Sequence, residues 1–285
     1  MGENSKFYLK GSVKVETTNL DYSNYLVIFV DILGSKNRSG FNELYTVNSI
    51  FHEEFEKNQK LDAPKRAYYR KIYTFSDCAY IFYSLRDKEK ETYDNICQMI
   101  QVALCNCEPI FLRFLKEKIV FRGGIAYGKA YVDPSRSMFF GEAVNKAYIL
   151  ESDKAVHPRI VVDESVAQAF SHAVTMAKTN IDTEIEEVDM DESYIEEFRH
   201  ILEFSTGEGL IEKDIDGQYI YNYLHSPENN IIINDCYSNP WVFLNNLLQF
   251  SKEQIEKNDS MRVIDKYIYL RNYVEKKFDS FLQNS

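Results

Sequence analysis

Two aspartates that follow apolar stretches are the residues most able to do chemistry. Asp31 ends the apolar run Tyr25–Val30, and Asp77 stands at the tip of an expected hairpin, after Tyr73-Thr-Phe-Ser. An apolar run of this length is typical of a strand buried on both faces. If that strand lies beside the hairpin, the carboxylates converge, and with a backbone carbonyl nearby they suit a hard cation such as Mg²⁺ or Mn²⁺. Either aspartate alone would more often be a turn residue, so it is the pair that predicts a metal site.

A third stretch, Phe121–Gly128, carries Arg122 followed by a glycine pair. The pair is expected to allow close packing in a central strand rather than to bind phosphate. The first strand, the hairpin and this strand must therefore lie side by side if Asp31, Asp77 and Arg122 are to form one site.

The elements that must position these residues alternate between strand-like and helix-like patterns. Apolar residues recur at helical spacing between the strands, and turn residues separate the strands of the hairpin. The order β-α-β-β-α-β-β-α-β predicts an α+β palm, in which helices cover an antiparallel sheet. Pro109 is expected to kink or restart the second helix. The predicted elements are a helix over 40–58, a hairpin over 66–84, a helix over 88–118, a strand over 119–127 that turns at Gly128-Lys129 into 130–133, a helix over 141–152, a strand over 159–162 and a helix from 163.

The chain changes character after residue 177. Nine acidic residues between Asp182 and Glu197 favour a solvated insertion or linker. Further strands are expected over 210–224, and the apolar spacing after Pro240 predicts helices. The predicted divisions are an N-terminal arm over 1–22, the domain that carries the site over 23–177, an acidic linker or insertion over 178–209, and a strand plus a mostly helical C-terminal extension over 210–285.

The composition limits the class of protein. The chain has 285 residues, of which 45% are hydrophobic, enough for a packed core. Its net charge of −11 argues against a nucleic-acid partner and against binding to anionic membranes. Its five cysteines are odd in number and lack zinc-site spacing, as in a reduced cytosolic protein. No apolar run is long enough to span a bilayer and no signal-like segment is present, so we expect a cytoplasmic protein.

Four stretches of the chain resemble the catalytic domain of class III nucleotidyl cyclases. They occur in that family's order and span about residues 24–165. Each motif alone is weak, whereas the ordered set of four is fairly specific. The stretches are Asp-Ile-Leu-Gly at 31–34, Phe-Ser-Asp-Cys-Ala-Tyr at 75–80, Arg-Gly-Gly-Ile-Ala-Tyr-Gly at 122–128 and Phe-Gly-Glu-Ala-Val-Asn-Lys-Ala at 140–147. The resemblance implies a class III nucleotide cyclase-like palm with a ferredoxin-like core.

The resemblance implies a role for each matching residue. Asp31 and Asp77 would hold two Mg²⁺ or Mn²⁺ ions per site, with the backbone carbonyl of Ile32 as a further ligand. Arg122 matches the arginine that contacts the substrate's triphosphate, and Asn145 matches the asparagine that steadies the reacting ribose and phosphate. The implied reaction is attack of the ribose 3′-oxygen on the α-phosphate of a nucleoside triphosphate, with loss of pyrophosphate. In this family the metal aspartates come from one subunit and the asparagine and base pocket from its partner, which implies a head-to-tail homodimer with two composite sites.

Two departures from the family's pattern bear on the base. Purine-specific members carry a lysine at the position of Tyr73 and an aspartate at that of Met138. An aromatic and an apolar side chain there would narrow the pocket and favour a pyrimidine, and Lys71, on the same strand face as Tyr73, could meet a base carbonyl. This pattern is similar to the bacterial pyrimidine cyclases of the Pycsar anti-phage system, so the expected substrate is CTP or UTP and the product cyclic CMP or cyclic UMP. An adenylate or guanylate cyclase with an altered base pocket is the alternative.

One departure weakens the catalytic interpretation. Family members usually carry an arginine four residues after the asparagine, where this chain has Ile149. Removing one transition-state donor typically costs ~2.7–4 kcal/mol, so either another cation substitutes or turnover is slow. The alternative is a catalytically weak or dead cyclase-homology module that binds a nucleotide and signals through its C-terminal helices. Candidates for the substitute cation are Lys154 and Arg159, and Lys213 is a candidate for the family's second triphosphate lysine.

Overall fold

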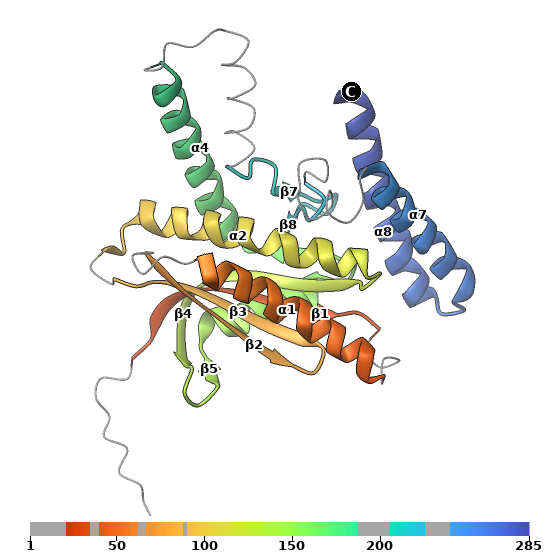
Figure 1. Ribbon diagram of the computed structural model, residues 1–285, viewed down its shortest axis with the longest axis horizontal. Coiled ribbons are helices and arrows are strands. Elements are labelled where there is room, and N and C mark those ends of the chain that lie inside the picture. Colours follow the sequence, from red (N-terminus) through yellow and green to blue (C-terminus); the bar gives the residue numbers. More distant parts are fainter. Residues whose placement is uncertain are drawn as a thin grey trace, which may run out of the picture.

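The computed structural model describes residues 21–34, 40–61, 67–87, 90–186, 206–225 and 240–284. Residues 1–20 of the expected N-terminal arm lie outside the described part of the chain. Residues 187–205, which include much of the acidic stretch, also lie outside it. The described strands form a mostly antiparallel sheet with helices packed on both of its faces (Figure 1). The predicted α+β architecture is confirmed.

The strand β1 is central to the first half of the sheet. It pairs antiparallel with β3 on one side and with β4 on the other, and β2 pairs antiparallel with β3. With one helix after β1 and one after β3, these strands have the β-α-β-β-α-β order of the predicted ferredoxin-like core. The four strands are β1 (Ser23–Ile32), β2 (Tyr68–Phe75), β3 (Cys78–Leu85) and β4 (Phe121–Asp133).

The sheet continues beyond β4. The strand β6 runs parallel to β4, and β8 and then β7 follow with antiparallel pairing. The strand β5 pairs with the far end of β4, off this path. Residues 211–221 therefore extend the same sheet that contains Asp31. The bounds are β5 (Met138–Phe140), β6 (Ile160–Val162), β7 (Ile211–Lys213) and β8 (Tyr219–Tyr221).

Strand alternation divides the core into two layers. In β1, Leu26 and Ile28 belong to the larger core, which α1, α2 and α4 cover. Val27 and Phe29 belong to the smaller core, which α3 covers. Asp31 follows Phe29 by two residues, so it lies on the same face of the sheet, the one that α3 covers. The helices are α1 (Phe41–Leu61), α2 (Tyr93–Lys116), α3 (Glu142–Ile149) and α4 (Glu164–Glu186).

The turn predicted at Gly128-Lys129 is wrong, because the strand β4 runs unbroken through it. The helix α2 does not restart at Pro109 but continues through it. The helix persists because buried side chains on both sides of the proline, among them Cys107 and Ile110, anchor it to the larger core. The strand persists because it pairs with β1 over the full length of β1. Tertiary contacts therefore outweigh the local preferences of proline and glycine.

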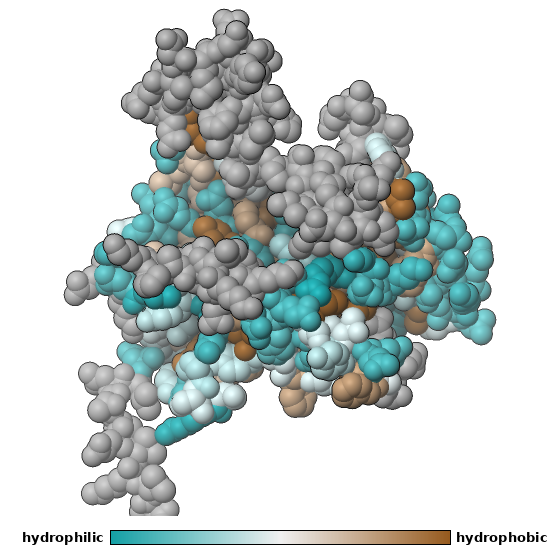
Figure 2. Space-filling view, in the orientation of Figure 1, coloured by the Kyte–Doolittle hydropathy of each residue, from teal (hydrophilic) through white to brown (hydrophobic). Residues whose placement is uncertain are grey.

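The C-terminal part of the chain forms a pair of helices, as predicted. The helices α7 (Pro240–Lys257) and α8 (Met261–Asn284) pack against each other. Leu244 of α7, and Leu270 and Val274 of α8, join the larger core. The surface over these helices is largely hydrophilic in the view of Figure 2, which fits a hairpin whose apolar side chains face inward. None of the described helices is long and apolar enough to cross a membrane.

The glycine pair of β4 allows two close approaches, of α3 at Gly124 and of the neighbouring strand β1 at Gly123. A Cβ atom at Gly124 would lie 2.1 Å from the backbone oxygen of Ala147, and one at Gly123 would lie 2.3 Å from that of Phe29. Contacts this short leave no room for a side chain. The pair therefore has the packing role that the sequence predicts.

Gly124→Ala is expected to destabilise the fold by about 1–3 kcal/mol, because the new methyl group meets backbone atoms and α3 must move. Gly40→Ala is the control, since the nearest atom to a Cβ there belongs to the flexible side chain of Glu43, at 3.6 Å. Urea unfolding followed by circular dichroism measures both variants. Equal unfolding midpoints would contradict the close approach of α3 to β4.

Candidate active site

The end of β1 brings together three of the predicted site residues. Asp31 pairs in register with Cys78 of β3 and with Arg122 of β4. The next residue, Ile32, donates its backbone N–H to the carbonyl oxygen of Asp77 at 3.1 Å. Asp31, Asp77 and Arg122 come from three separate motifs and lie at one end of the sheet.

The turn that carries Asp77 is held by α1. Ser76 adopts the left-handed conformation, with a φ of 56°, which is uncommon for a residue other than glycine. Its carbonyl oxygen accepts a hydrogen bond from Nδ2 of Asn48 at 3.0 Å. On the other side of the turn, the thiol of Cys78 donates to the carbonyl oxygen of Phe75 at 3.2 Å. These bonds fix the position of Asp77 relative to Asp31.

Arg122 lies between two carboxylates. Its Nε is 3.2 Å from Oδ2 of Asp31 and 2.5 Å from Oε1 of Glu151. The side chain of Glu151 is only 3% exposed. Glu151 belongs to η3, a π-helical turn (Leu150–Lys154) that follows α3 directly. Such turns next to α-helices occur frequently at functional sites.

Glu151 is a site residue that the sequence interpretation missed. It falls within the helix predicted over 141–152. A signal was present, because Ala143, Ala147 and Glu151 recur every four residues and therefore share one helix face. The two alanines are fully buried on the sheet. A buried carboxylate on such an apolar face needs a neighbouring cation, and Arg122 is that cation.

The carboxylates of this cluster outnumber its guanidinium. Burial raises the pKa of Asp31; Arg122 opposes the rise and the charge of Asp77 adds to it. Burial also raises the pKa of Glu151 to about 7, with Arg122 opposing and Asp31 adding. The thiol pKa of Cys78 rises to about 11, first through burial and then through the charges of Asp77, Asp31 and Glu151. Burial is the main cause of each shift and the neighbouring carboxylates add to it, so a bound cation would favour the charged forms of these groups.

Asp31 and Asp77 fit a divalent cation that takes part of its coordination from a substrate. In the described part of the chain, no three His, Cys, Asp or Glu side chains are arranged to hold a metal ion. Mg²⁺ in phosphoryl-transfer sites is usually bound through one or two carboxylates together with substrate phosphates and water. The carboxylates of Asp31 and Asp77, together with the carbonyl group of Ile32, are oxygen ligands of the kind that such a Mg²⁺ site uses.

Tyr73 and Lys71 share one face of β2, in line with strand alternation. The Tyr73 ring lies 5.7 Å from the ring of Phe82 and 5.0 Å from that of Phe139. Its hydroxyl is buried and finds no hydrogen-bond partner among the described residues. Lys71 and Phe82 help to line a hollow of about 320 Å³ beside it. This face therefore offers an aromatic surface next to one cation.

Met138 lies apart from Tyr73. It lines a separate hollow of about 220 Å³ together with Tyr131 and Phe140. Strand alternation turns its neighbour Phe139 to the other side of β5, where that ring packs against Tyr73. Within one chain, the residue that contacts the ring of Tyr73 is therefore Phe139 and not Met138. The sequence interpretation missed Phe139, although it stands in an apolar triplet.

Asn145 lies on the exposed face of α3. Tyr148 and Ile149, three and four residues later, are 51% and 50% exposed. These spacings place all three on one face of the helix. Lys146 points elsewhere and forms an ion pair with Asp163 at 2.8 Å. Asn145 therefore lies on a helix face that points away from the rest of its own chain.

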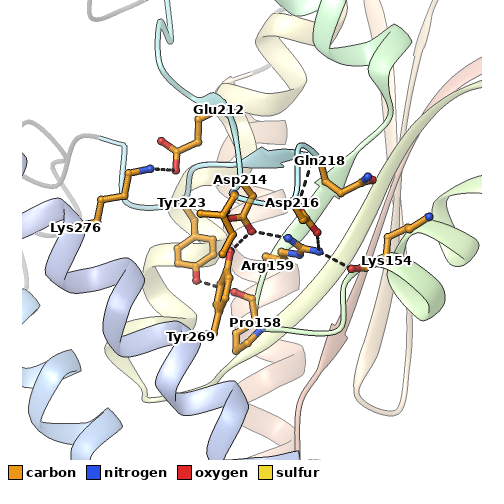
Figure 3. Close-up of polar contacts among 11 residues, drawn as sticks. Lys154, Pro158, Arg159, Glu212, Asp214, Asp216, Gln218, Tyr223, Tyr269 and Lys276 are labelled. Atoms are coloured by element: carbon orange, nitrogen blue, oxygen red, sulfur yellow. Dashed lines mark hydrogen bonds and ion pairs between the residues drawn. The ribbon is translucent and has the colours of Figure 1, made fainter.

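The cations considered as substitutes for the missing arginine and lysine lie elsewhere. Arg159 is buried and pairs with Asp214 at 2.5 Å and with Asp216 at 2.6 Å (Figure 3). Its guanidinium is therefore committed to those carboxylates. Lys154 is exposed at the end of η3, and Lys213 lies over an aromatic ring of β8 at 4.9 Å.

No family model and no curated protein matches the sequence. Among solved structures, the monomeric guanylyl cyclase domain of the RhoGC fusion protein from the aquatic fungus Blastocladiella emersonii is 19% identical, with a TM-score of 0.39, and the match covers 53% of this chain and 87% of that one. The catalytic core of a rhodopsin-guanylyl cyclase with converted specificity, in complex with ATPalphaS, is 20% identical, with a TM-score of 0.39 and coverage of 53% and 82%. The guanylyl cyclase Cya2 is 13% identical, with a TM-score of 0.36 and coverage of 52% and 79%. Because this similarity is low, we infer the chemistry of the site from its own residues.

Arg122→Met is expected to destabilise the fold by about 1.5–3 kcal/mol, because it leaves the buried Glu151 without its cation. Adding Glu151→Gln should recover part of the loss, since the amide carries no charge. Urea unfolding of the two single variants and the double variant gives the coupling energy between the side chains. Strictly additive losses would contradict the buried ion pair.

Proposed function

We propose that the chain is a nucleotidyl cyclase that converts CTP or UTP to the 3′,5′-cyclic nucleotide and pyrophosphate. The observation that carries the proposal is the meeting of Asp31, Asp77 and Arg122 at the end of β1. These residues come from the motifs that resemble class III cyclases, and they lie far apart in the sequence.

The proposed reaction forms one bond and breaks one bond. The ribose 3′-oxygen attacks the α-phosphorus, the bond from that phosphorus to the bridging oxygen breaks, pyrophosphate leaves and the 3′-hydroxyl proton passes to solvent. Two divalent cations bound by Asp31 and Asp77 would lower the pKa of the 3′-hydroxyl and screen charge on the phosphoryl oxygens. Arg122 would turn from Asp31 to a substrate phosphate. Alignment of the two reacting groups within one molecule contributes on the order of 7–11 kcal/mol.

The proposal includes a homodimer with two composite sites. Asn145 shares an outward helix face with Tyr148 and Ile149, and the latter two are about half exposed. Because Asn145 faces away from its own chain, it would contact a nucleotide that a second copy of the chain holds.

The proposed preference for a pyrimidine rests on Tyr73. Its ring is packed between Phe82 and Phe139, so a bulky aromatic group stands where purine-specific relatives carry a lysine. Lys71 lies on the same face and could meet a base carbonyl. By the same resemblance of motifs, the product would be a second messenger made in the cytoplasm during anti-phage defence.

Incubation of the full chain with each of the four nucleoside triphosphates and Mn²⁺, with mass spectrometry of the products, tests the reaction. Asp31→Ala and Asp77→Ala are each expected to lower kcat by at least about a hundredfold, because each removes a metal ligand. Asp87→Ala is the control, since Asp87 belongs to a surface ion pair with Lys90 at 3.6 Å. Full activity in either site variant would refute the metal assignment.

Tyr73→Ala is expected to lower the preference for pyrimidine over purine substrates, measured as the ratio of kcat/KM values, by about tenfold, because it enlarges the base pocket. Tyr45→Ala is the control, since Tyr45 is 63% exposed on α1. Cyclic AMP or cyclic GMP as the sole product of the wild type would overturn the pyrimidine assignment and leave the cyclase assignment intact.

One observation favours a second candidate, a nucleotide-binding module without catalysis. Ile149, half exposed on the face of Asn145, stands where the family carries its transition-state arginine. Nucleotide binding is expected of both candidates, whereas product formation is expected of the cyclase alone. The assay with four nucleotides therefore separates them.

A further inference from the structure

The short connection between η3 and β6 is held by residues from the C-terminal part of the sequence. The hydroxyl of Tyr223 donates to the carbonyl oxygen of Pro158 at 2.9 Å, in a buried hydrogen bond. The ring of His157 stacks on that of Tyr269 in α8, with the centroids 4.9 Å apart and the planes 4° apart. Two aromatic residues that follow much later in the sequence therefore fix this connection.

Arg159, at the end of the connection, contacts both η3 and β4. Its guanidinium donates to the carbonyl oxygen of Lys154, the last residue of η3, at 2.8 Å (Figure 3). Its own carbonyl oxygen accepts the backbone N–H of Gly123, the neighbour of Arg122, at 3.1 Å. A cationic side chain that bonds the last carbonyl groups of a helix stabilises that end of the helix. Arg159 therefore fixes the end of η3 relative to the strand that carries Arg122.

The turn between β7 and β8 holds Arg159 in turn. Oδ2 of Asp214 and Oδ2 of Asp216 lie 2.5 Å and 2.6 Å from its two terminal guanidinium nitrogens. The hydroxyl of Tyr269 donates to the same oxygen of Asp214 at 2.7 Å (Figure 3). Because the side chain of Arg159 is only 6% exposed, removal of these partners would leave a buried charge unpaired. The docked helix α8 and the turn therefore hold the guanidinium in one place.

The same network ends at the candidate active site. Glu151 lies in η3, three residues before Lys154. Its Oε1 is 2.5 Å from Nε of Arg122, and that nitrogen is 3.2 Å from Oδ2 of Asp31. A shift of the end of η3 would therefore move the carboxylate that holds Arg122. Direct contacts and the short segment η3 thus connect Tyr269 of α8 to the end of β1.

We propose that Arg159 is a positioning residue, which keeps Arg122 in place at the candidate active site by holding η3 and with it Glu151. The helix α8 secures Arg159 through Tyr269 and Asp214, so docking of this helix is a condition for the arrangement of the site. The inference rests on the proposed function, in which Arg122 binds a substrate phosphate. Glu151 keeps Arg122 beside the site when the guanidinium turns to that phosphate.

Nuclear magnetic resonance of the Nε–H group of Arg122 in the full chain tests the positioning without turnover. Its signal is assigned by its loss in Arg122→Lys. Arg159→Met is expected to speed the exchange of this proton with water by about tenfold or more, because the carboxylate of Glu151 is no longer held against it. Tyr269→Phe removes only the hydrogen bond to α8 and should cause a smaller change in the same direction.

Arg271→Met is the matched control. Arg271 lies on the same helix as Tyr269 and pairs with Glu275 at 3.8 Å, within α8. Its removal takes away one arginine and one ion pair but leaves the contacts of Arg159 untouched. The exchange rate at Arg122 should therefore equal that of the wild type.

Kinetics with CTP or UTP and Mn²⁺ measure the consequence for the reaction. Arg159→Met is expected to lower kcat/KM by about tenfold in the wild-type background and by about twofold or less in the Glu151→Gln background, where η3 no longer holds Arg122 through an ion pair. A residue with only a structural role would cause equal losses in both backgrounds.

Equal exchange at Arg122 in the wild type and in a folded Arg159→Met variant overturns the proposal, and so do equal kinetic losses in the two backgrounds. Circular dichroism shows whether the fold is kept, and Tyr269→Phe replaces Arg159→Met if that variant unfolds. Faster exchange in Arg159→Met of a chain that forms no cyclic product contradicts the proposed function alone. Product formation together with unchanged exchange in Arg159→Met contradicts the role of Arg159 alone.

Discussion

The ion pairs of Arg122 with Asp31 and Glu151 are the interaction on which the rest of the site depends. They join the end of the central strand, the neighbouring strand β4 and the π-helical turn after α3. Gly124 makes the junction possible, because any side chain there would push α3 away from the sheet. Arg122 lowers the pKa of both carboxyl groups, whereas their burial raises it.

The C-terminal half of the chain is built into the same structure. The strands β7 and β8 extend the sheet, and apolar residues of α7 and α8 share its larger core. The buried guanidinium of Arg159 links η3 to the β7–β8 turn, and Tyr269 links that turn to α8. Loss of the C-terminal helices would therefore expose core residues.

Much of the fold could be predicted from sequence because it depends on local period and on the order of elements. The alternation in β1 and the hairpin around Asp77 are such features, and they suffice to bring Asp31 and Asp77 to one end of the sheet. The turn expected at Gly128 is wrong, and α2 does not restart at Pro109, because contacts with distant partners decide those elements. The docking of α8 could not be predicted, since it depends on contacts between residues remote in sequence, such as that of Tyr269 with Asp214.

The most direct test of the central claim is a crystal structure with Mn²⁺ and a CTP analogue that cannot cyclise. We expect anomalous Mn²⁺ peaks within roughly 2.0–2.6 Å of carboxylate oxygens of Asp31 and Asp77, with Arg122 turned from Asp31 to a phosphate. Mn²⁺ bound elsewhere, or Arg122 still paired with Asp31 while the nucleotide is bound, would contradict it.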